Sequence, residues 1–186
     1  CEAGGIHGHD GRTGTRIPAA CSVTVGRVRL MRVWRIATDT PDYSSDDLSG
    51  AGAKITGGRW NRPGLAVLYC ADVPSLACLE TLVHLGTSGL PLNRYLVAID
   101  VPDPLWRVRE IRTPASLPVA WDACPAGKSS LDFGDSWLKS RRTAVLAVPS
   151  VIVPEDSVIL VNPLHSDAPS VTSSTKRRWL YDPRLR

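Results

Sequence analysis

The chain has 186 residues, of which 43% are hydrophobic, and its formal net charge is +4. This size and composition fit one globular domain with its own core, and no apolar run reaches the roughly 20 residues of a membrane span. The charge is too small for a dedicated nucleic-acid binder, so we expect neither direct nucleic-acid binding nor membrane contact. The five cysteines form no CxxC pair. Their odd number predicts reduced thiols in the cytoplasm and neither a disulfide framework nor a zinc site.

The first 30 residues show no helical or alternating apolar pattern, and the single methionine, Met31, follows them. They also lack the long apolar segment of a secretory signal. We predict that residues 1–30 are an extension outside the fold, upstream of a natural start at Met31, and that 31–186 form one domain. An ordered N-terminal arm is the alternative. Residues 1–30 contain four arginines and two acidic residues, so the predicted domain carries a net charge of only +2.

Runs rich in β-forming residues predict six strands. The predicted strands, of which the fourth has the weakest pattern, cover residues 32–37, 65–71, 94–101, 106–111, 143–149 and 157–162. One helix is predicted at 76–85, capped by Ser75 and ended by Gly86. A second, short helix is predicted at 135–142.

The remaining segments read as loops. Residues 40–53 are polar, with Tyr43 and Leu48 as the expected anchors to the core. Residues 113–130 are predicted to be irregular with one helical turn, and 175–186 to be a solvated basic tail. Short strands around a few short helices predict a single α+β domain with a curved, mainly antiparallel mixed sheet.

The turn Gly57-Gly58-Arg59-Trp60-Asn61 is the most informative segment. Its two glycines permit positive φ and a close approach of the backbone to a ligand. The Arg59 guanidinium suits phosphate or carboxylate, while Trp60 and Tyr69 offer rings that stack on a planar group. A solvated arginine and rings that only fill the core are the commoner alternatives. Together these residues predict a site for an anionic, partly aromatic small molecule, such as a dinucleotide.

Two charged residues fall in otherwise apolar elements. Glu80 lies at the edge of the apolar arc of the predicted helix, where a carboxylate is partly desolvated and must be hydrogen-bonded, paired or functional. A solvated glutamate, or one paired with His84, is the alternative. Arg35 shares a strand face with Val33 and Ala37. If it points inward it needs an anionic partner, either Glu80 or a ligand phosphate, whereas an outward arginine at a sheet edge is commoner.

Ser136 lies where the second predicted helix begins. A hydroxyl and free N–H groups at a helix N-terminus form a natural position for a phosphate or ribose. Ordinary N-capping by Asp135 or Ser136 is the alternative. Neither His84 nor His165 has metal partners at ligand spacing, and no phosphate-binding glycine motif is present, so no metal or bound cofactor is predicted.

Nine segments, in sequence order, resemble the RES domain, which is the toxin half of a class of bacterial toxin–antitoxin pairs. No single segment is decisive, and the resemblance covers almost all of 31–186 while leaving 1–30 outside. The segments are Trp34-Arg35-Ile36, Leu48-Ser49-Gly50, Gly57-Gly58-Arg59-Trp60-Asn61, Leu68-Tyr69, Leu76-Ala77-Cys78-Leu79-Glu80, Gly134-Asp135-Ser136-Trp137-Leu138, Val148-Pro149-Ser150, Asn162-Pro163-Leu164-His165 and Asp182-Pro183-Arg184-Leu185.

The RES family is named after an arginine, a glutamate and a serine. On the resemblance we assign the glutamate to Glu80 and the serine to Ser136, and the arginine is either Arg35 or Arg59. The resemblance also implies an ADP-ribosyltransferase-like fold with NAD+ bound as a substrate in a cleft of the sheet. Substrate binding is assigned to Tyr43, Gly58, Trp60, Asn61 and Tyr69.

Known family members break down NAD+ or transfer ADP-ribose to a protein, and a cognate antitoxin with a helix-turn-helix DNA-binding part blocks them. We therefore expect an NAD+ glycohydrolase toxin, with protein ADP-ribosylation as the alternative. A homodimer within the toxin–antitoxin complex is compatible with the resemblance. A non-enzymatic DNA-binding regulator is a third hypothesis, which the near-neutral domain opposes. In the enzyme, Glu80 would stabilise the positive charge that develops on the ribose as nicotinamide leaves.

Overall fold

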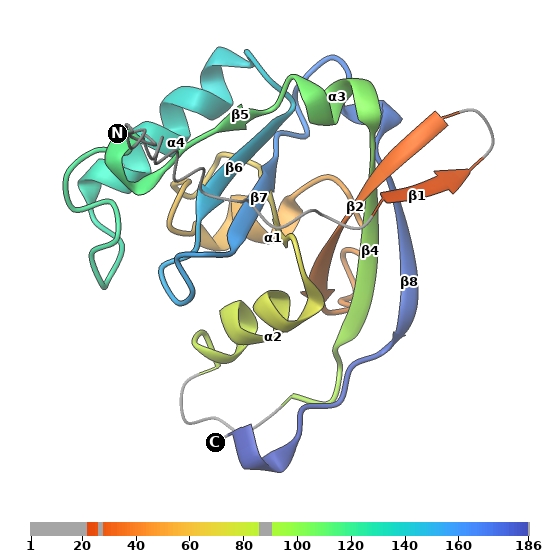
Figure 1. Ribbon diagram of the computed structural model, residues 1–186. Coiled ribbons are helices and arrows are strands. Elements are labelled where there is room, and N and C mark those ends of the chain that lie inside the picture. Colours follow the sequence, from red (N-terminus) through yellow and green to blue (C-terminus); the bar gives the residue numbers. More distant parts are fainter. Residues whose placement is uncertain (1–21, 26–27, 86–90, 186) are drawn as a thin grey trace, which may run out of the picture.

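Eight strands form one sheet in the computed structural model, which describes residues 22–25, 28–85 and 91–185 (Figure 1). The strand order is β5-β6-β7-β3-β2-β4-β8, and β1 pairs with β2 outside this path. The pairing of β5 with β6 is parallel and the other pairings are antiparallel. The strands are β1 Ser22–Val25, β2 Val28–Ala37, β3 Leu68–Ala71, β4 Tyr95–Pro102, β5 Glu110–Ile111, β6 Val145–Pro149, β7 Ser157–Val161 and β8 Thr172–Arg178.

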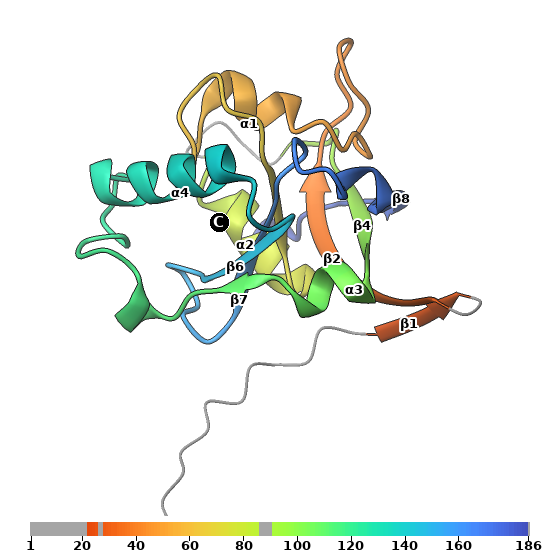
Figure 2. The same ribbon diagram turned by 90° about the horizontal axis from the view of Figure 1, so that it is seen from above.

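The described residues also form four α-helices and three short 3-10 turns. The helices are α1 Ala51–Thr56, α2 Pro74–Leu82, α3 Asp103–Arg107 and α4 Lys128–Ser140, and the turns are Pro114–Ser116, Ala168–Ser170 and Pro183–Leu185. Helices α1 and α4 lie on the same side of the molecule, away from β1 (Figure 2). Within the described segments, no helix has the length and apolarity required to cross a bilayer. The predicted α+β class with a mainly antiparallel mixed sheet is confirmed.

The sheet narrows at the junction of β2 and β3, where a single residue pair, Trp34 with Ala71, joins the two strands. On one side of this junction lie the strands β2, β4 and β8, and on the other lie β3, β5, β6 and β7. Helix α2 packs against both β2 and β3 and therefore covers the junction (Figure 1).

Two apolar clusters form the core, and the alternation along the strands divides their side chains. We call the cluster that contains Val33 and Ala147 the first core, and the cluster that contains Trp60 and Leu146 the second core. Helix α3 packs on the first core. Helices α2 and α4 contribute side chains to the second core, namely Leu76, Ala77, Trp137 and Leu138.

The predicted N-terminal boundary is wrong in part. Residues 22–25 and 28–30 lie within the segment expected outside the fold, but they form β1 and the start of β2. The two strands pair from Ser22 with Met31 to Val25 with Val28. The other residues of 1–30 lie outside the described part of the chain.

Other elements also differ from the sequence prediction, and helix α1, for example, begins inside the expected loop 40–53. Of the expected strand at 106–111, residues 106–107 end α3, 108–109 connect the two elements, and only Glu110–Ile111 pairs as β5. The expected solvated tail begins inside β8, which is an edge strand paired with β4. Strand β8 is Thr-Ser-Ser-Thr-Lys-Arg-Arg, and an edge strand tolerates such polar and basic residues because one edge faces water.

Candidate active site

The carboxylate of Glu80 is held by the hydroxyl of Ser150. The Ser150 Oγ donates to Glu80 Oε1 over 2.7 Å and accepts the backbone N–H groups of Ile152 and Val153 at 3.0 and 3.2 Å. Because both acceptor positions of the hydroxyl are taken, its single hydrogen is directed at the carboxylate. Within the described residues, Glu80 Oε2 has no protein partner. One oxygen is therefore fixed, and the other remains able to bind a ligand.

Glu80 and Ser150 lie in separate elements of the fold. Glu80 lies in the last turn of α2, whose buried residues belong to the second core. Ser150 follows β6 directly and is fully buried. It continues the alternation of Leu146 and Val148, which places it on the side of the second core. Ser150 lies in one of the segments that resemble the RES domain, but it was not among the predicted site residues, and this alternation is the signal that could have indicated it.

Ser136 is not at a helix N-terminus, so the predicted helix start at this residue is wrong, while its assignment as the serine of the site stays a prediction. Helix α4 begins at Lys128, and Ser136 lies well inside it on an exposed face. The Lys128 ammonium pairs with Asp132 one turn later, which supports a first turn that the sequence prediction left irregular. Ser136 lines an open surface hollow of about 530 Å³ together with Arg62, Asp132, Asp135, Lys139 and Ser140.

Arg35 does not pair with Glu80. Its Nη1 donates to the carbonyl oxygen of Asp47 at 3.0 Å. In β2 it alternates in phase with Val33 and Ala37, which belong to the first core, whereas Glu80 lies on the side of the second core. The expected ion pair between Arg35 and Glu80 is therefore absent from the described residues.

Arg59 also binds backbone carbonyls. Its Nη1 donates to the carbonyl oxygens of Trp121 and Ala123 at 2.9 and 2.8 Å. Glycine is required at the two preceding positions for different physical reasons. Gly57 has φ +71, which favours glycine, whereas a Cβ on Gly58 would lie 2.6 Å from the Tyr69 hydroxyl.

The hydroxyl of Tyr69 organises the turn from beneath. It accepts the backbone N–H of Trp60 at 2.9 Å and donates to Asn61 Oδ1 at 2.8 Å. Burial raises the pKa of Tyr69 well above its ordinary value, and the Trp60 N–H and the charge of Arg59 offset this only in part. The phenol is therefore neutral at physiological pH and acts as a hydrogen-bond relay.

The other residues assigned to substrate binding have internal roles. The amide of Asn61 is fully buried and donates to three carbonyls, those of Ala53, Arg62 and Leu65. The Trp60 ring is 2% exposed and stacks on Trp121, with centroids 6.0 Å apart and planes at 17°. Trp60 thus corresponds to the alternative in which the ring only fills the core. Tyr43 lies against α1, because its hydroxyl is 3.2 Å from where a Cβ on Gly52 would sit.

No group of three or more histidine, cysteine, aspartate or glutamate side chains converges on a metal position in the residues that the structure describes. The buried thiol of Cys70 is not a reactive group, since burial raises its pKa to about 12. Among the predicted site residues, the structure thus shows the Glu80 carboxylate with its serine, and two arginines bound to carbonyls, of which Arg35 lies on the side of the first core and not on that of Glu80.

The curved, mainly antiparallel sheet with short helices is an α+β fold of the ADP-ribosyltransferase-like class. Within that class, residues 32–182 match the family model described as the RES domain, and the chain belongs to this family of toxins. The predicted family is confirmed.

Three relatives illustrate the similarity. The chain is 60% identical over 152 residues to the Prs ADP-ribosylating toxin of Sphingobium sp. (strain YBL2), which covers 82% of this chain and 94% of the relative. It is 36% identical over 145 residues to toxin Res of Yersinia enterocolitica, covering 77% of this chain and 93% of the relative. It is 37% identical over 142 residues to toxin Res of Pseudomonas putida, covering 75% and 90%.

Proposed function

We propose that this RES-domain toxin cleaves the bond between nicotinamide and ribose in NAD+ and transfers the ADP-ribose to a protein. The observation that carries the proposal is the Glu80 carboxylate, which is fixed through one oxygen by Ser150 and unpartnered at the other within the described residues. The name of the Sphingobium relative, an ADP-ribosylating toxin, supports transfer to a protein. Hydrolysis by water, the glycohydrolase activity expected from the sequence, shares the same bond cleavage and is the alternative.

The chemistry requires a fixed negative charge beside the ribose. When the bond breaks, its electron pair neutralises the nicotinamide ring and positive charge develops at the ribose carbon. A preorganised carboxylate stabilises that charge without reorienting. Glu80 takes this role, and its free oxygen binds a ribose hydroxyl or the incoming nucleophile. As the new bond to the ribose carbon forms, the nucleophile gives up its proton to solvent water.

The dinucleotide also needs cations for its pyrophosphate. Arg35 and Arg59 donate to carbonyls, and neither has a carboxylate partner among the described residues. Arg32, by contrast, is paired with Asp100. A guanidinium whose charge is not neutralised by an acid can bind phosphate oxygens. We therefore assign the pyrophosphate to Arg59 and not to Arg35, which lies on the side of the first core, away from Glu80.

A toxin of this kind requires an inhibitor in the cell that makes it. Relatives in Yersinia enterocolitica and Pseudomonas putida are named toxin Res, which supports a cognate antitoxin as the partner of this chain. We propose that the antitoxin blocks access of NAD+ to Glu80 and that it carries the helix-turn-helix part expected from the resemblance.

The test uses purified protein and NAD+ labelled in its adenylate half. The reaction is run with and without Prs, the target that the name of the Sphingobium relative gives. Nicotinamide release reports bond cleavage, a labelled Prs band reports transfer, and free ADP-ribose reports hydrolysis. Glu80→Gln should lower nicotinamide release by about 100-fold or more while NAD+ still binds. The matched control is Glu155→Gln, since Glu155 is exposed between β6 and β7. Normal release by Glu80→Gln would contradict the proposal.

A further inference from the structure

Residues 57–64, which we call the arginine loop, carry Arg59 and contact α4 at two adjacent positions. A Cβ on Gly134 would lie 1.9 Å from the carbonyl oxygen of Trp60, so the backbones of helix and loop touch there. The neighbouring Asp135 binds Arg62, two residues further along the loop. The proposed reaction uses neither residue, although both belong to a segment that resembles the RES domain.

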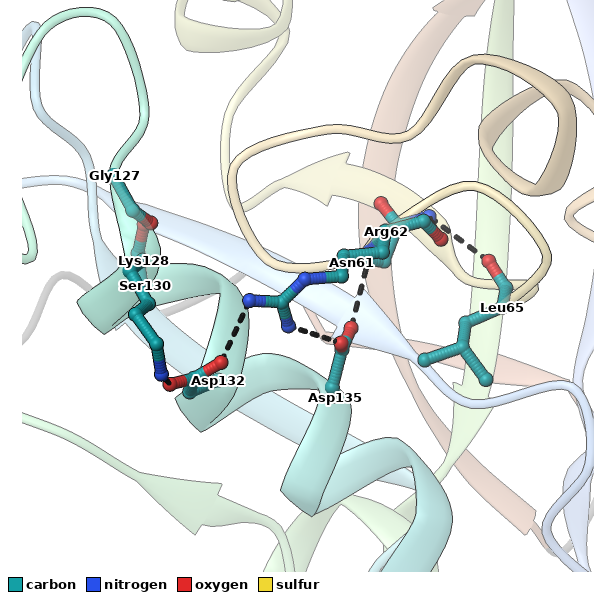
Figure 3. A network of polar contacts seen from close by, with 8 residues as sticks. All are labelled: Asn61, Arg62, Leu65, Gly127, Lys128, Ser130, Asp132 and Asp135. Atoms are coloured by element: carbon teal, nitrogen blue, oxygen red, sulfur yellow. Dashed lines mark hydrogen bonds and ion pairs between the residues drawn. The ribbon is translucent and has the colours of Figure 1, made fainter.

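Asp135 binds Arg62 through both of its oxygens. Its Oδ1 accepts the backbone N–H of Arg62 at 3.0 Å, and its Oδ2 accepts the guanidinium Nη1 at 2.5 Å (Figure 3). The Asp135 side chain is only 8% exposed. A buried carboxylate that accepts a backbone N–H fixes the main chain itself, which a contact with a side-chain tip does not.

Asp132 provides a contrast on the same helix. It binds the same guanidinium through Nη2 at 2.6 Å, but its side chain is 46% exposed, and it also pairs with Lys128 (Figure 3). Exposed ion pairs of this kind stabilise little. Asp132 is therefore a matched control for Asp135, since it shares the helix, the partner and the charge but makes no bond to the loop backbone.

The fixed loop determines where Arg59 can lie. Asn61, adjacent to Arg62, is held by three carbonyls and by the Tyr69 hydroxyl, which makes the loop rigid, so that the bond from Asp135 to Arg62 sets the position of the loop against α4 as one piece. Beyond Trp60 the chain reaches Arg59, whose guanidinium is directed at the carbonyls of Trp121 and Ala123. The three residues that connect Asp135 to Arg59, namely Arg62, Asn61 and Trp60, are thus each held by a hydrogen bond or a buried ring.

We propose that Asp135 is a positioning residue of the NAD+ site, which places Arg59 for the pyrophosphate by fixing the backbone of the arginine loop. This inference rests on the proposed function. Glu80 and Ser150 come from α2 and the end of β6, so loss of Asp135 leaves them in place. The effect of Asp135 therefore falls on NAD+ binding and not on bond cleavage.

The experiment measures KM and kcat for nicotinamide release in wild type, Asp135→Ala, Asp135→Asn and Asp132→Asn, with melting temperatures. Asp135→Ala should raise KM about tenfold or more and change kcat less than about threefold. Asp135→Asn keeps an oxygen for the Arg62 N–H and should raise KM by a smaller factor, which makes it the conservative rescue. Asp132→Asn should match wild type in both constants.

A role in stability alone predicts another pattern, in which the melting temperature and apparent kcat fall while KM stays at the wild-type value. That pattern in Asp135→Ala overturns the inference, and if this variant does not fold, the same pattern in Asp135→Asn does so. NAD+ affinity, measured by calorimetry in a Glu80→Gln background, should fall by the same factor without requiring turnover. Wild-type protein that neither binds nor cleaves NAD+ refutes the proposed function, whereas active protein with unchanged KM in the Asp135 variants refutes only the positioning role.

Discussion

Ser150 and Glu80 are 70 positions apart in the sequence, yet the serine hydroxyl donates to the carboxylate over 2.7 Å. The serine is itself fixed by two backbone N–H groups of the turn that follows it. The orientation of the glutamate is therefore set by β6 and its following turn as much as by its own helix.

Ser150→Ala should lower kcat for nicotinamide release by about 10- to 100-fold, because the carboxylate loses the donor that orients it. The variant should also unfold more easily by about 1–3 kcal/mol, since two backbone N–H groups lose their acceptor. Steady-state kinetics and denaturant unfolding measure the two effects. Ser140→Ala, at an exposed position on α4, is the control. If Ser136→Ala loses as much activity as Ser150→Ala, Ser136 is also required for the reaction, as the sequence assignment predicts.

Tyr69→Phe should destabilise the protein by about 1–3 kcal/mol, because the Trp60 N–H and the Asn61 side-chain oxygen each lose a buried partner. Denaturant unfolding gives the value. Tyr95→Phe is the matched control, since the Tyr95 hydroxyl makes no hydrogen bond within the described residues. Equal stability of the two variants would show that the tyrosine hydroxyl does not hold the arginine loop.

Gly134→Ala should destabilise the protein by about 1–3 kcal/mol even though alanine is the better helix former by about 1 kcal/mol. The reason is the overlap of the new methyl group with the Trp60 carbonyl, 1.9 Å away. Gly127→Ala is the comparison, because its Cβ meets no atom closer than 4.0 Å. It should stay within about 1 kcal/mol of wild type. A Gly134→Ala protein that is more stable than wild type would exclude the close contact.

Asp72→Asn should stabilise the protein at neutral pH. Asp72 is 5% exposed and its Oδ2 accepts the Ser157 N–H, while Oδ1 has no partner among the described atoms. Burial is the main cause that raises the pKa of Asp72 above its usual value. A raised folded-state pKa means that the protonated form is favoured by folding, so the wild type loses stability as pH rises through that pKa.

The difference between Asp72→Asn and wild type should therefore be constant below the unfolded-state pKa of about 3.9 and grow as pH rises above it. It should level off once pH exceeds the folded-state pKa. Melting temperatures from acidic to neutral pH measure this curve, with Asp122→Asn at an exposed site as the control. A difference that shrinks with rising pH would reverse the sign of the argument.

The buried strands could be predicted from the sequence because each is a continuous run of apolar, β-forming residues. The runs at 94–101, 143–149 and 157–162 became β4, β6 and β7 almost unchanged. Strand β8 could not be predicted in this way, because an edge strand with polar residues has no apolar alternation to detect. The first turn of α4 was missed because Gly127 and the nearby prolines resemble a loop, while its support comes partly from the Lys128–Asp132 pair.

The site was only partly predictable for a related reason. Glu80 was identifiable because a carboxylate beside an apolar helical arc is unusual within a single element. Its bond with Ser150 joins two elements that no local pattern connects. The roles of Trp60, Asn61 and Tyr69 in fixing the arginine loop likewise depend on burial, which the types of the residues do not reveal.

The single residue pair between β2 and β3 also determines how the protein responds to substitutions at that junction. Helix α2 spans that junction and carries Glu80, whereas Ser150 belongs to the strands on one side of it. A separation of the two strand groups would therefore misalign the acid and its serine even with every helix and strand intact. Substitutions at this junction should accordingly give proteins that still fold but have lost their toxicity.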